Sequence, residues 1–388
     1  MNWTKKVLAF SIVFFLSLLL LKGFDLAVGY VLGSDDLAKT KVQMEPRTIA
    51  LSEHNPNYDV KIMPDNGYME GTQGLEQKEY RLRTNNQGFI IGERDTVKKS
   101  NAVDIIFFGG STTECKYVEE DKRFPYLVAD KLEKKDGLLL QTLNGGVSGN
   151  NTINSLLNSI VKGLEIKPKF MVLMHAVNDV ALISKEQAYW RGPKSKVFIN
   201  EGKIIKDPTF IYFLFKQVKK ILIPNIWLQI RHVVSAKIDD TGNADEWASS
   251  RNNPKANYSD VEQVLAEDFS SALKSFVAVS RAWGVEPILM TQFNRILISD
   301  SFIRTQYEKT SQPISYDEFA KLYSLANELI RKIAKDEQVF LIDLDKELTG
   351  NNIYIYDAVH LNTQGSIVVA EYIANEMAKK YPEFYRLN

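Results

Sequence analysis

Cysteine and histidine are scarce in this chain of 388 residues, which contains one cysteine and four histidines. A single cysteine, Cys115, excludes a disulfide within the chain and a zinc site built from several thiolates. The histidines show no HExxH spacing, which argues against the common type of zinc hydrolase. We therefore predict a protein without a metal site.

An excess of charge of either sign is also missing. Lys and Arg together number 48, as do Asp and Glu, so the formal net charge is zero. Domains that bind nucleic acid usually carry a clustered positive excess, so we predict no nucleic-acid partner. With 45% apolar and 25% charged residues, the composition is that of an ordinary globular protein, and the length allows one large domain or two modest ones.

The N-terminus carries a long apolar run, residues 7–21, which follows two lysines and precedes Lys22. A bilayer span needs about 20 apolar residues, so this run crosses a membrane only if Lys22 snorkels and the span continues. A cleaved signal peptide is the alternative, but its small-x-small site is present only weakly, around residues 27–29. We favour an uncleaved anchor within residues 1–33. The lysines before it predict a single-pass protein of the cell membrane with an extracytoplasmic main domain.

The rest of the sequence divides into two predicted parts. Residues 34–98 contain turn formers and short alternating runs, and we predict an extended appendage there, with a hairpin in YRLRTNNQGFII at 80–91. Within residues 99–388, buried strand patterns alternate with helical ones. This alternation predicts an α/β domain with a mainly parallel sheet and helices on both faces. In such sheets, functional residues gather at the carboxyl ends of the strands.

Residues 184–260 interrupt the alternation of strands and helices. They combine an apolar and basic stretch, divided by Pro224, with a polar stretch. We favour an inserted pair of helices that packs on the domain. A lid or a membrane-contacting element is the alternative, suggested by the interleaved Phe, Trp, Lys and Arg residues.

Three short segments follow the first three predicted strands of the main domain. In FFGGST, Ser111 comes after two glycines, as either a helix cap or a nucleophile. The glycines of NGGVSGN, residues 144–150, form either a plain turn or a place where backbone N–H groups stabilise an oxyanion. In HAVND, the amide of Asn178 can serve the same oxyanion, with an Asn-Asp turn as the structural alternative.

A fourth segment, DAVHLN, places Asp357 and His360 just before the last predicted helix. At this spacing the carboxylate can orient the imidazole, which can then take a proton from a serine. Each of the four segments is a weak signal by itself. Together, in this order and at strand ends, they supply the nucleophile, base, orienting acid and oxyanion donors of a serine hydrolase.

The four segments resemble the sequence blocks of the SGNH hydrolases, also called the GDSL esterase and lipase family, in its membrane-anchored bacterial form. GGST matches the first block, NGGVSGN the second, AVND the third and DAVH the fifth, and the resemblance covers residues 100–182 and 280–385. Gly110 stands in place of the Asp of GDS, and Ala176 replaces the usual glycine of the third block. The resemblance implies a flavodoxin-like three-layer α/β/α sandwich without metal or cofactor.

The resemblance also implies a role for each site residue. Ser111 is expected to be the nucleophile, His360 the base and Asp357 the acid that orients it. The oxyanion is expected to lie against the N–H groups of Ser111 and Gly149 and the side-chain amide of Asn178.

These roles predict a serine esterase that removes small acyl groups, above all acetyl, from cell-envelope or secreted glycans. Its substrate would be an acylated glycan or a small ester, and the N-terminal segment would hold it at the membrane. Two alternatives use the same residues: an O-acyltransferase to polysaccharide, and a lipase or thioesterase whose 184–260 insertion contacts lipid. A non-enzymatic envelope-assembly protein with a relic site is a further alternative.

Several other residues allow a second interpretation. We expect His175 to be a structural histidine at a strand end, and Cys115 to be a packed thiol about one helical turn after the serine. Asp343 and Asp345 are a candidate glycosidase pair, but two carboxylates at the end of a strand more often stabilise the sheet end.

Overall fold

The computed structural model describes residues 16, 48–49, 51–92, 103–134, 140–190, 199–200, 256–310 and 312–386. The chain divides into two compact units, Met1–Thr48 with Asn200–Leu214, and Ile49–Ile199 with Phe215–Asn388. Two short strands, β1 (Thr48–Ile49) and β9 (Ile199–Asn200), mark the points along the chain where the units divide. The other elements named below belong to the second unit.

The predicted anchor within residues 1–33 lies outside the described residues, apart from Leu16. Most of the predicted insertion, residues 191–198 and 201–255, lies outside them as well. Among the helices that are described, none has the length and apolar character needed to cross a membrane.

An eight-stranded sheet forms the centre of the second unit, in the order β11-β10-β8-β5-β7-β4-β3-β2. Its five parallel strands are β5 (Ile105–Gly109), β7 (Thr142–Gly146), β8 (Phe170–Met174), β10 (Glu286–Met290) and β11 (Phe340–Ile342). Numbered along the chain, they have the flavodoxin-like order 2-1-3-4-5. β5 and β8 are buried along their whole length, which explains their continuous apolar sequences. The predicted mainly parallel sheet is confirmed.

Three strands of the N-terminal segment extend this sheet beyond β7: β2 (Asp59–Ile62), β3 (Tyr80–Thr84) and β4 (Ile90–Ile91). They run antiparallel to their neighbours, and β4 joins β7 with Ile90 opposite Asn144. The pairing of β3 with β4 confirms the predicted hairpin. The segment therefore shares the hydrogen-bond ladder of the central sheet, whereas the predicted domain boundary after residue 98 stays a prediction.

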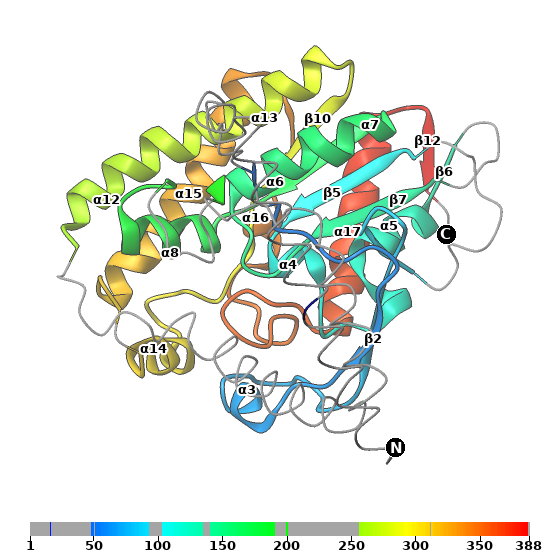
Figure 1. Ribbon diagram of the computed structural model, residues 1–388. Coiled ribbons are helices and arrows are strands. Elements are labelled where there is room, and N and C mark those ends of the chain that lie inside the picture. The colour runs from blue at the N-terminus through cyan, green and yellow to red at the C-terminus, as the bar shows by residue number, and fades with distance from the viewer. Residues whose placement is uncertain are drawn as a thin grey trace. The chain divides into compact units, whose positions relative to one another are not determined.

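Helices cover both faces of the parallel strands (Figure 1). Because successive strand residues point to opposite faces, Ile106 and Phe108 of β5 join one apolar cluster, and Ile105 and Phe107 join the other. The first cluster includes α6 (Thr152–Asn158), α8 (Val177–Glu186), α13 (Ser270–Ala282) and α15 (Tyr316–Asp336). The second includes α5 (Phe124–Lys131) and α17 (Thr363–Lys380). The fold is the three-layer α/β/α sandwich that the resemblance implies.

Shorter elements complete the described structure. They are α3 (Asn66–Glu70), α4 (Ser111–Glu114), α7 (Leu164–Ile166), α12 (Tyr258–Val264), α14 (Ser301–Glu308), α16 (Leu344–Leu348) and the antiparallel pair β6 (Leu132–Lys134) and β12 (Phe384–Arg386). Tighter or wider helical turns occupy Glu120–Lys122, Ser159–Gly163 and Leu265–Phe269. Local sequence fixes several helix starts: Ser315 with Glu318 forms a capping box on α15, and Asn151 with Asn154 forms one on α6.

Candidate active site

Ser111 begins α4 directly after β5, at the carboxyl end of the central parallel strand. Gly110 is the N-cap of this short helix. A Cβ atom at position 110 would lie 2.6 Å from Nδ2 of Asn178, closer than real Cβ contacts allow. Glycine at this position lets the amide of Asn178 lie close to the backbone beside Ser111, whereas a larger residue would displace the Asn178 side chain.

Ser111, His360 and Asp357 form a continuous chain of hydrogen bonds. His360 Nε2 lies 2.7 Å from Ser111 Oγ, and His360 Nδ1 lies 2.7 Å from Asp357 Oδ2. With the Nδ1 hydrogen donated to the carboxylate, Nε2 is the acceptor for the serine hydroxyl. The fold thus brings together two side chains that are 249 positions apart in sequence. This arrangement can remove the hydroxyl proton of Ser111.

The loop before α17 holds the imidazole in place from several directions. Asp357 Oδ1 accepts hydrogen bonds from the backbone N–H groups of Val359 and His360, at 2.9 and 2.8 Å. The Tyr356 ring stacks on the His360 ring with centroids 5.8 Å apart and an interplanar angle of 18°. The hydroxyl of Tyr356 lies 3.2 Å from that of Tyr68 in α3. These contacts restrict the rotation of both Asp357 and His360.

The local charges shift the pKa values of the pair in opposite directions. Burial alone would raise the pKa of Asp357, but the charge and hydrogen bond of His360, with two backbone donors, hold it below the ordinary value. Burial alone would lower the pKa of His360, but the charge and hydrogen bond of Asp357 raise it above its ordinary value. The pair is therefore arranged to stabilise an imidazolium once the serine has given up its proton.

The segments predicted to bind an oxyanion lie beside Ser111. Gly149 has a φ of +79°, in a turn closed by a hydrogen bond from the Asn150 N–H to the Val147 carbonyl. Asn178 donates one amide hydrogen to the Asn150 carbonyl at 2.8 Å, and an amide nitrogen carries two. The second-block loop and Asn178 are thus joined to each other next to the Ser111 backbone. Their part in binding an oxyanion stays a prediction.

Ala176, which departs from the family pattern, is accommodated by the backbone. It is the N-cap of α8, and its φ of −166° is open to any residue. The alanine therefore does not prevent Asn178 from reaching its place in the first turn of the helix.

A buried carboxylate about one turn after Ser111, that of Glu114, was not identified from the sequence. Glu114 accepts a hydrogen bond from the Ser148 hydroxyl, and His54 Nε2 lies 3.3 Å from Glu114 Oε1. Burial opposes the ionisation of Glu114, but His54 and Ser148 hold its pKa below the ordinary value. Through these contacts Glu114 connects α4, the Gly149 loop and the N-terminal segment. Ser148 lies within NGGVSGN, so only its proximity to Gly149 could have drawn attention to it.

The same N-terminal segment supports the Gly149 loop through its backbone. The carbonyl of Ser52 accepts hydrogen bonds from Nδ2 of Asn150 at 3.0 Å and from Nδ2 of Asn158 at 2.8 Å. Lys162 and Glu53 add an ion pair of 2.8 Å next to these bonds. The loop that carries Gly149 is therefore fixed from outside the parallel sheet.

The other residues that the sequence analysis weighed are buried in the fold or paired with charged side chains. His175 is buried against Ser155, with 2.7 Å between Nε2 and Oγ, and burial lowers its pKa to about 3. Cys115 is buried, and burial raises the pKa of its thiol to about 12. Asp343 and Asp345 both bind Arg331, at 2.6 to 2.9 Å. The structural interpretation holds for all of them. Within the described ranges, no group of three metal-binding side chains comes together.

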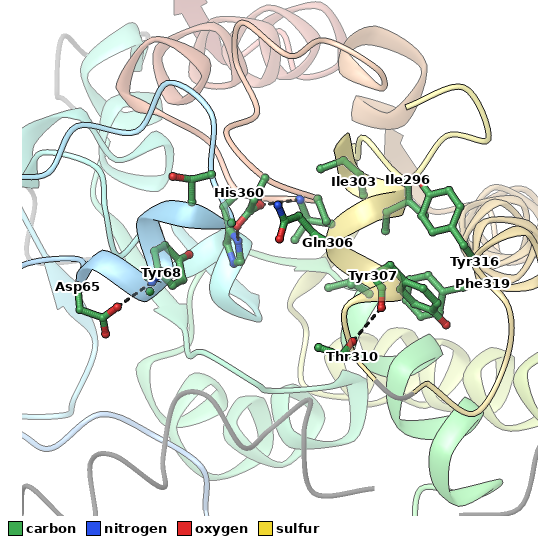
Figure 2. A pocket seen from close by; sticks show the side chains of 17 residues that line it. Asp65, Tyr68, Ile296, Ile303, Gln306, Tyr307, Thr310, Tyr316, Phe319 and His360 are labelled. Atoms are coloured by element: carbon green, nitrogen blue, oxygen red, sulfur yellow. Dashed lines mark hydrogen bonds and ion pairs between the residues drawn. The ribbon is translucent and has the colours of Figure 1, made fainter. Parts of the chain in front are cut away.

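A cavity of about 480 Å³ opens beside the His360 side chain. Asp357, Val359 and His360 line one part of it, and side chains of α3, α14 and the start of α15 line the rest. Figure 2 shows His360 beside Tyr68 toward one end, with Tyr307, Tyr316 and Phe319 gathered at the other. His360 thus borders a half-open cavity large enough for a small molecule.

Comparison with known proteins gives likeness at the level of structure. No protein-family model and no curated protein matches the sequence. An acetylxylan esterase from Geobacillus stearothermophilus matches 71% of this chain and 94% of its own, at 14% identity and a TM-score of 0.38. An acetyl xylan esterase named AlAXEase matches 70% of this chain and 98% of its own, at 17% identity and a TM-score of 0.40. A GDSL-like lipase from Bacteroides thetaiotaomicron matches 74% of this chain and 95% of its own, at 13% identity and a TM-score of 0.39.

Proposed function

We propose that this protein is a serine ester hydrolase of the SGNH type. The observation that supports the proposal most directly is the hydrogen-bonded chain from Ser111 through His360 to Asp357, at the carboxyl end of a parallel strand. A nucleophile, a base and an orienting group within hydrogen-bond distance are the parts that acyl transfer to a serine requires.

In the proposed reaction, His360 takes the proton of Ser111 as Oγ attacks the ester carbonyl. The oxyanion that forms accepts hydrogen bonds from the N–H groups of Ser111 and Gly149 and from the Asn178 amide. His360 then gives its proton to the departing alcohol, which leaves an acyl group on Ser111. Water, activated by the same imidazole, releases the acid. Asp357 acts through His360, by holding its tautomer and stabilising the imidazolium.

For the substrate class, we propose acyl esters of cell-envelope or secreted glycans, with acetyl as the smallest acyl group. The apolar run after two N-terminal lysines supports an extracytoplasmic place of action, with the chain held at the cell membrane. The Ser111 site supports an ester as the bond that is cleaved.

The test is covalent labelling combined with turnover, using the full-length protein. A fluorophosphonate probe should label the wild type and leave a Ser111→Ala variant unlabelled. The same variant should hydrolyse p-nitrophenyl acetate more slowly by about a thousandfold or more. A Ser271→Ala variant, which changes an exposed serine of α13, controls for the loss of a hydroxyl elsewhere. Undiminished activity in Ser111→Ala would end the proposal.

A further inference from the structure

The cavity beside His360 is larger than an acetyl group needs. Its volume of about 480 Å³ falls within the range of pockets that hold whole small molecules. It begins at the proposed base and extends between α3 and α14 toward α15 (Figure 2). Ser111 does not itself line the cavity, but its Oγ lies 2.7 Å from Nε2 of His360, which does. An acetyl group on Ser111 would therefore reach only the part nearest the imidazole. The rest of the space needs a larger occupant.

The walls of the cavity are apolar and firmly packed. Ile296, Ile303 and Phe319 line it and are each at most 4% exposed. Tyr307 and Tyr316 also line it, but their hydroxyls donate to the backbone carbonyls of Ile314 and Leu297, at 3.0 and 2.9 Å. The two tyrosines therefore present ring carbon to the cavity, with their polar atoms already bonded. Such walls favour an occupant without hydroxyl groups of its own.

The polar groups at the rim are engaged as well. The Thr72 and Thr310 hydroxyls donate to the carbonyls of Met69 and Tyr307, and Gln306 Nε2 donates to the Glu70 carbonyl at 3.3 Å. A sugar ring in this space would lose hydrogen bonds to water and find few partners in return. The glycan part of a substrate is therefore expected outside the cavity.

Charge also limits the occupant. Among the described residues that line the cavity there is no lysine or arginine, whereas two acidic residues, Asp65 and Asp357, are part of the lining. An acyl group ending in a carboxylate would meet like charge without a compensating cation. The lining therefore fits a neutral group.

We propose that this cavity is an acyl-chain pocket, and that the enzyme prefers esters of neutral, apolar acyl groups longer than the acetyl group expected from the sequence. The inference rests on the proposed function, because the acyl carbonyl must lie at Ser111 for its chain to enter the cavity. Tyr68 of α3 and Gln306 of α14 both line the cavity, so these elements would help determine which acyl groups are accepted.

A series of p-nitrophenyl esters tests the chain-length preference in the full-length protein. Acetate, butyrate, hexanoate and octanoate are compared as monomers in solution. Each methylene that enters the pocket should raise kcat/KM by about fourfold, until the pocket is full. A succinyl ester, which ends in a carboxylate, should be hydrolysed more slowly than the butyrate. Values that stay flat or fall from acetate onward would overturn the inference.

Two isomeric esters separate an acyl pocket from an alcohol pocket. Ethyl octanoate carries its long chain on the acyl side, and octyl acetate carries a chain of the same length on the alcohol side. We expect a higher kcat/KM for ethyl octanoate, measured by acid release. A preference for octyl acetate would show that the cavity takes the leaving alcohol, against the inference.

A substitution in the cavity lining tests whether the cavity causes the chain-length preference. Gln306→Trp adds bulk to the cavity lining at a partly exposed position and should lower the octanoate-to-acetate ratio of kcat/KM at least tenfold. Thr305→Trp, on the neighbouring exposed side of α14, adds the same bulk away from the cavity and should leave the ratio unchanged. An unchanged ratio in Gln306→Trp would refute the pocket. Absent labelling of Ser111 together with no hydrolysis of any ester would instead refute the proposed function.

Discussion

Replacing Asp357 by asparagine tests the chain of hydrogen bonds with little change in shape. Asparagine can still accept from the N–H groups of Val359 and His360 through its oxygen, so the loop should keep its conformation. Its NH₂ group, however, would face His360 Nδ1, where the carboxylate now lies 2.7 Å away. The imidazole would then carry its proton on Nε2 and could no longer accept the Ser111 proton. A loss of about four orders of magnitude in kcat is expected.

The pH dependence of kcat/KM tests the role of Asp357 in a second way. The base must be neutral to act, and Asp357 raises the pKa of His360 above its ordinary value of 6.5. In the wild type, kcat/KM should therefore rise with pH through an apparent pKa above 6.5. Without the negative charge of Asp357 the imidazolium is less stable. The rising limb of the kcat/KM profile should therefore move to lower pH in Asp357→Asn.

The free energy of unfolding of Asp357→Asn should differ from that of the wild type in a defined pH window. The lowered pKa of Asp357 stabilises the fold above its unfolded value of 3.8, and this contribution is lost as pH falls through the folded pKa. The raised pKa of His360 stabilises the fold below its unfolded value of 6.5, and this contribution is lost as pH rises through the folded pKa. The variant should therefore lose most stability between pH 3.8 and 6.5.

The assay measures p-nitrophenyl ester hydrolysis against pH, with chemical denaturation at the same pH values. Asp260→Asn, on the surface helix α12, is the matched control and should resemble the wild type in both measurements. Retention of more than a tenth of the wild-type kcat in Asp357→Asn would refute the role assigned to the carboxylate. A shift of the acid limb to higher pH would refute the electrostatic reasoning.

Two further predictions concern the groups around the oxyanion. Asn178→Ala should lower kcat by about a hundred- to a thousandfold with a small change in KM, because an oxyanion donor acts mainly in the transition state; equal effects on both constants would contradict this role. Ser148→Ala, which removes the bond to Glu114, should lower kcat with little change in KM, and Ser148→Thr should restore part of it. If Ser148→Ala changes the free energy of unfolding but leaves kcat unaltered, the serine is only structural.

The sequence predicted site residues best where a strand ends or a helix begins. Ser111, Asn178 and His360 could be placed at one edge because each follows a predicted strand or precedes a helix, and parallel strands end at a common edge. Buried strands such as Ile105–Gly109 are apolar throughout, so their existence could be predicted. The order of the strands in the sheet could not be predicted from the alternation of strands and helices along the chain. It could be expected only from the resemblance, since strand order depends on pairings between segments far apart in the chain.

Contacts between distant segments explain what sequence reasoning missed. Glu114 and His54 are 60 positions apart, and neither lies in a recognisable pattern with the other. The attachment of β4 to β7 depends on a pairing of Ile90 with Asn144, which leaves no periodic signal in either segment. The cavity has the same origin: its walls come from α3, α14 and the loop of His360. These segments lie far apart in the sequence, and their shared surface exists only after folding.

These long-range contacts make the N-terminal segment part of the proposed catalytic centre. Ser52 supports the loop of Gly149, His54 contacts the carboxylate that binds Ser148, and Tyr68 both lines the cavity and bonds to Tyr356 behind the imidazole. A domain cut after residue 98 would retain Ser111, Asp357 and His360 but lose one wall of the cavity and two supports of the Gly149 loop. In the proposed enzyme, the parallel sheet would place Ser111, and the residues that precede its first strand would contribute to the choice of substrate.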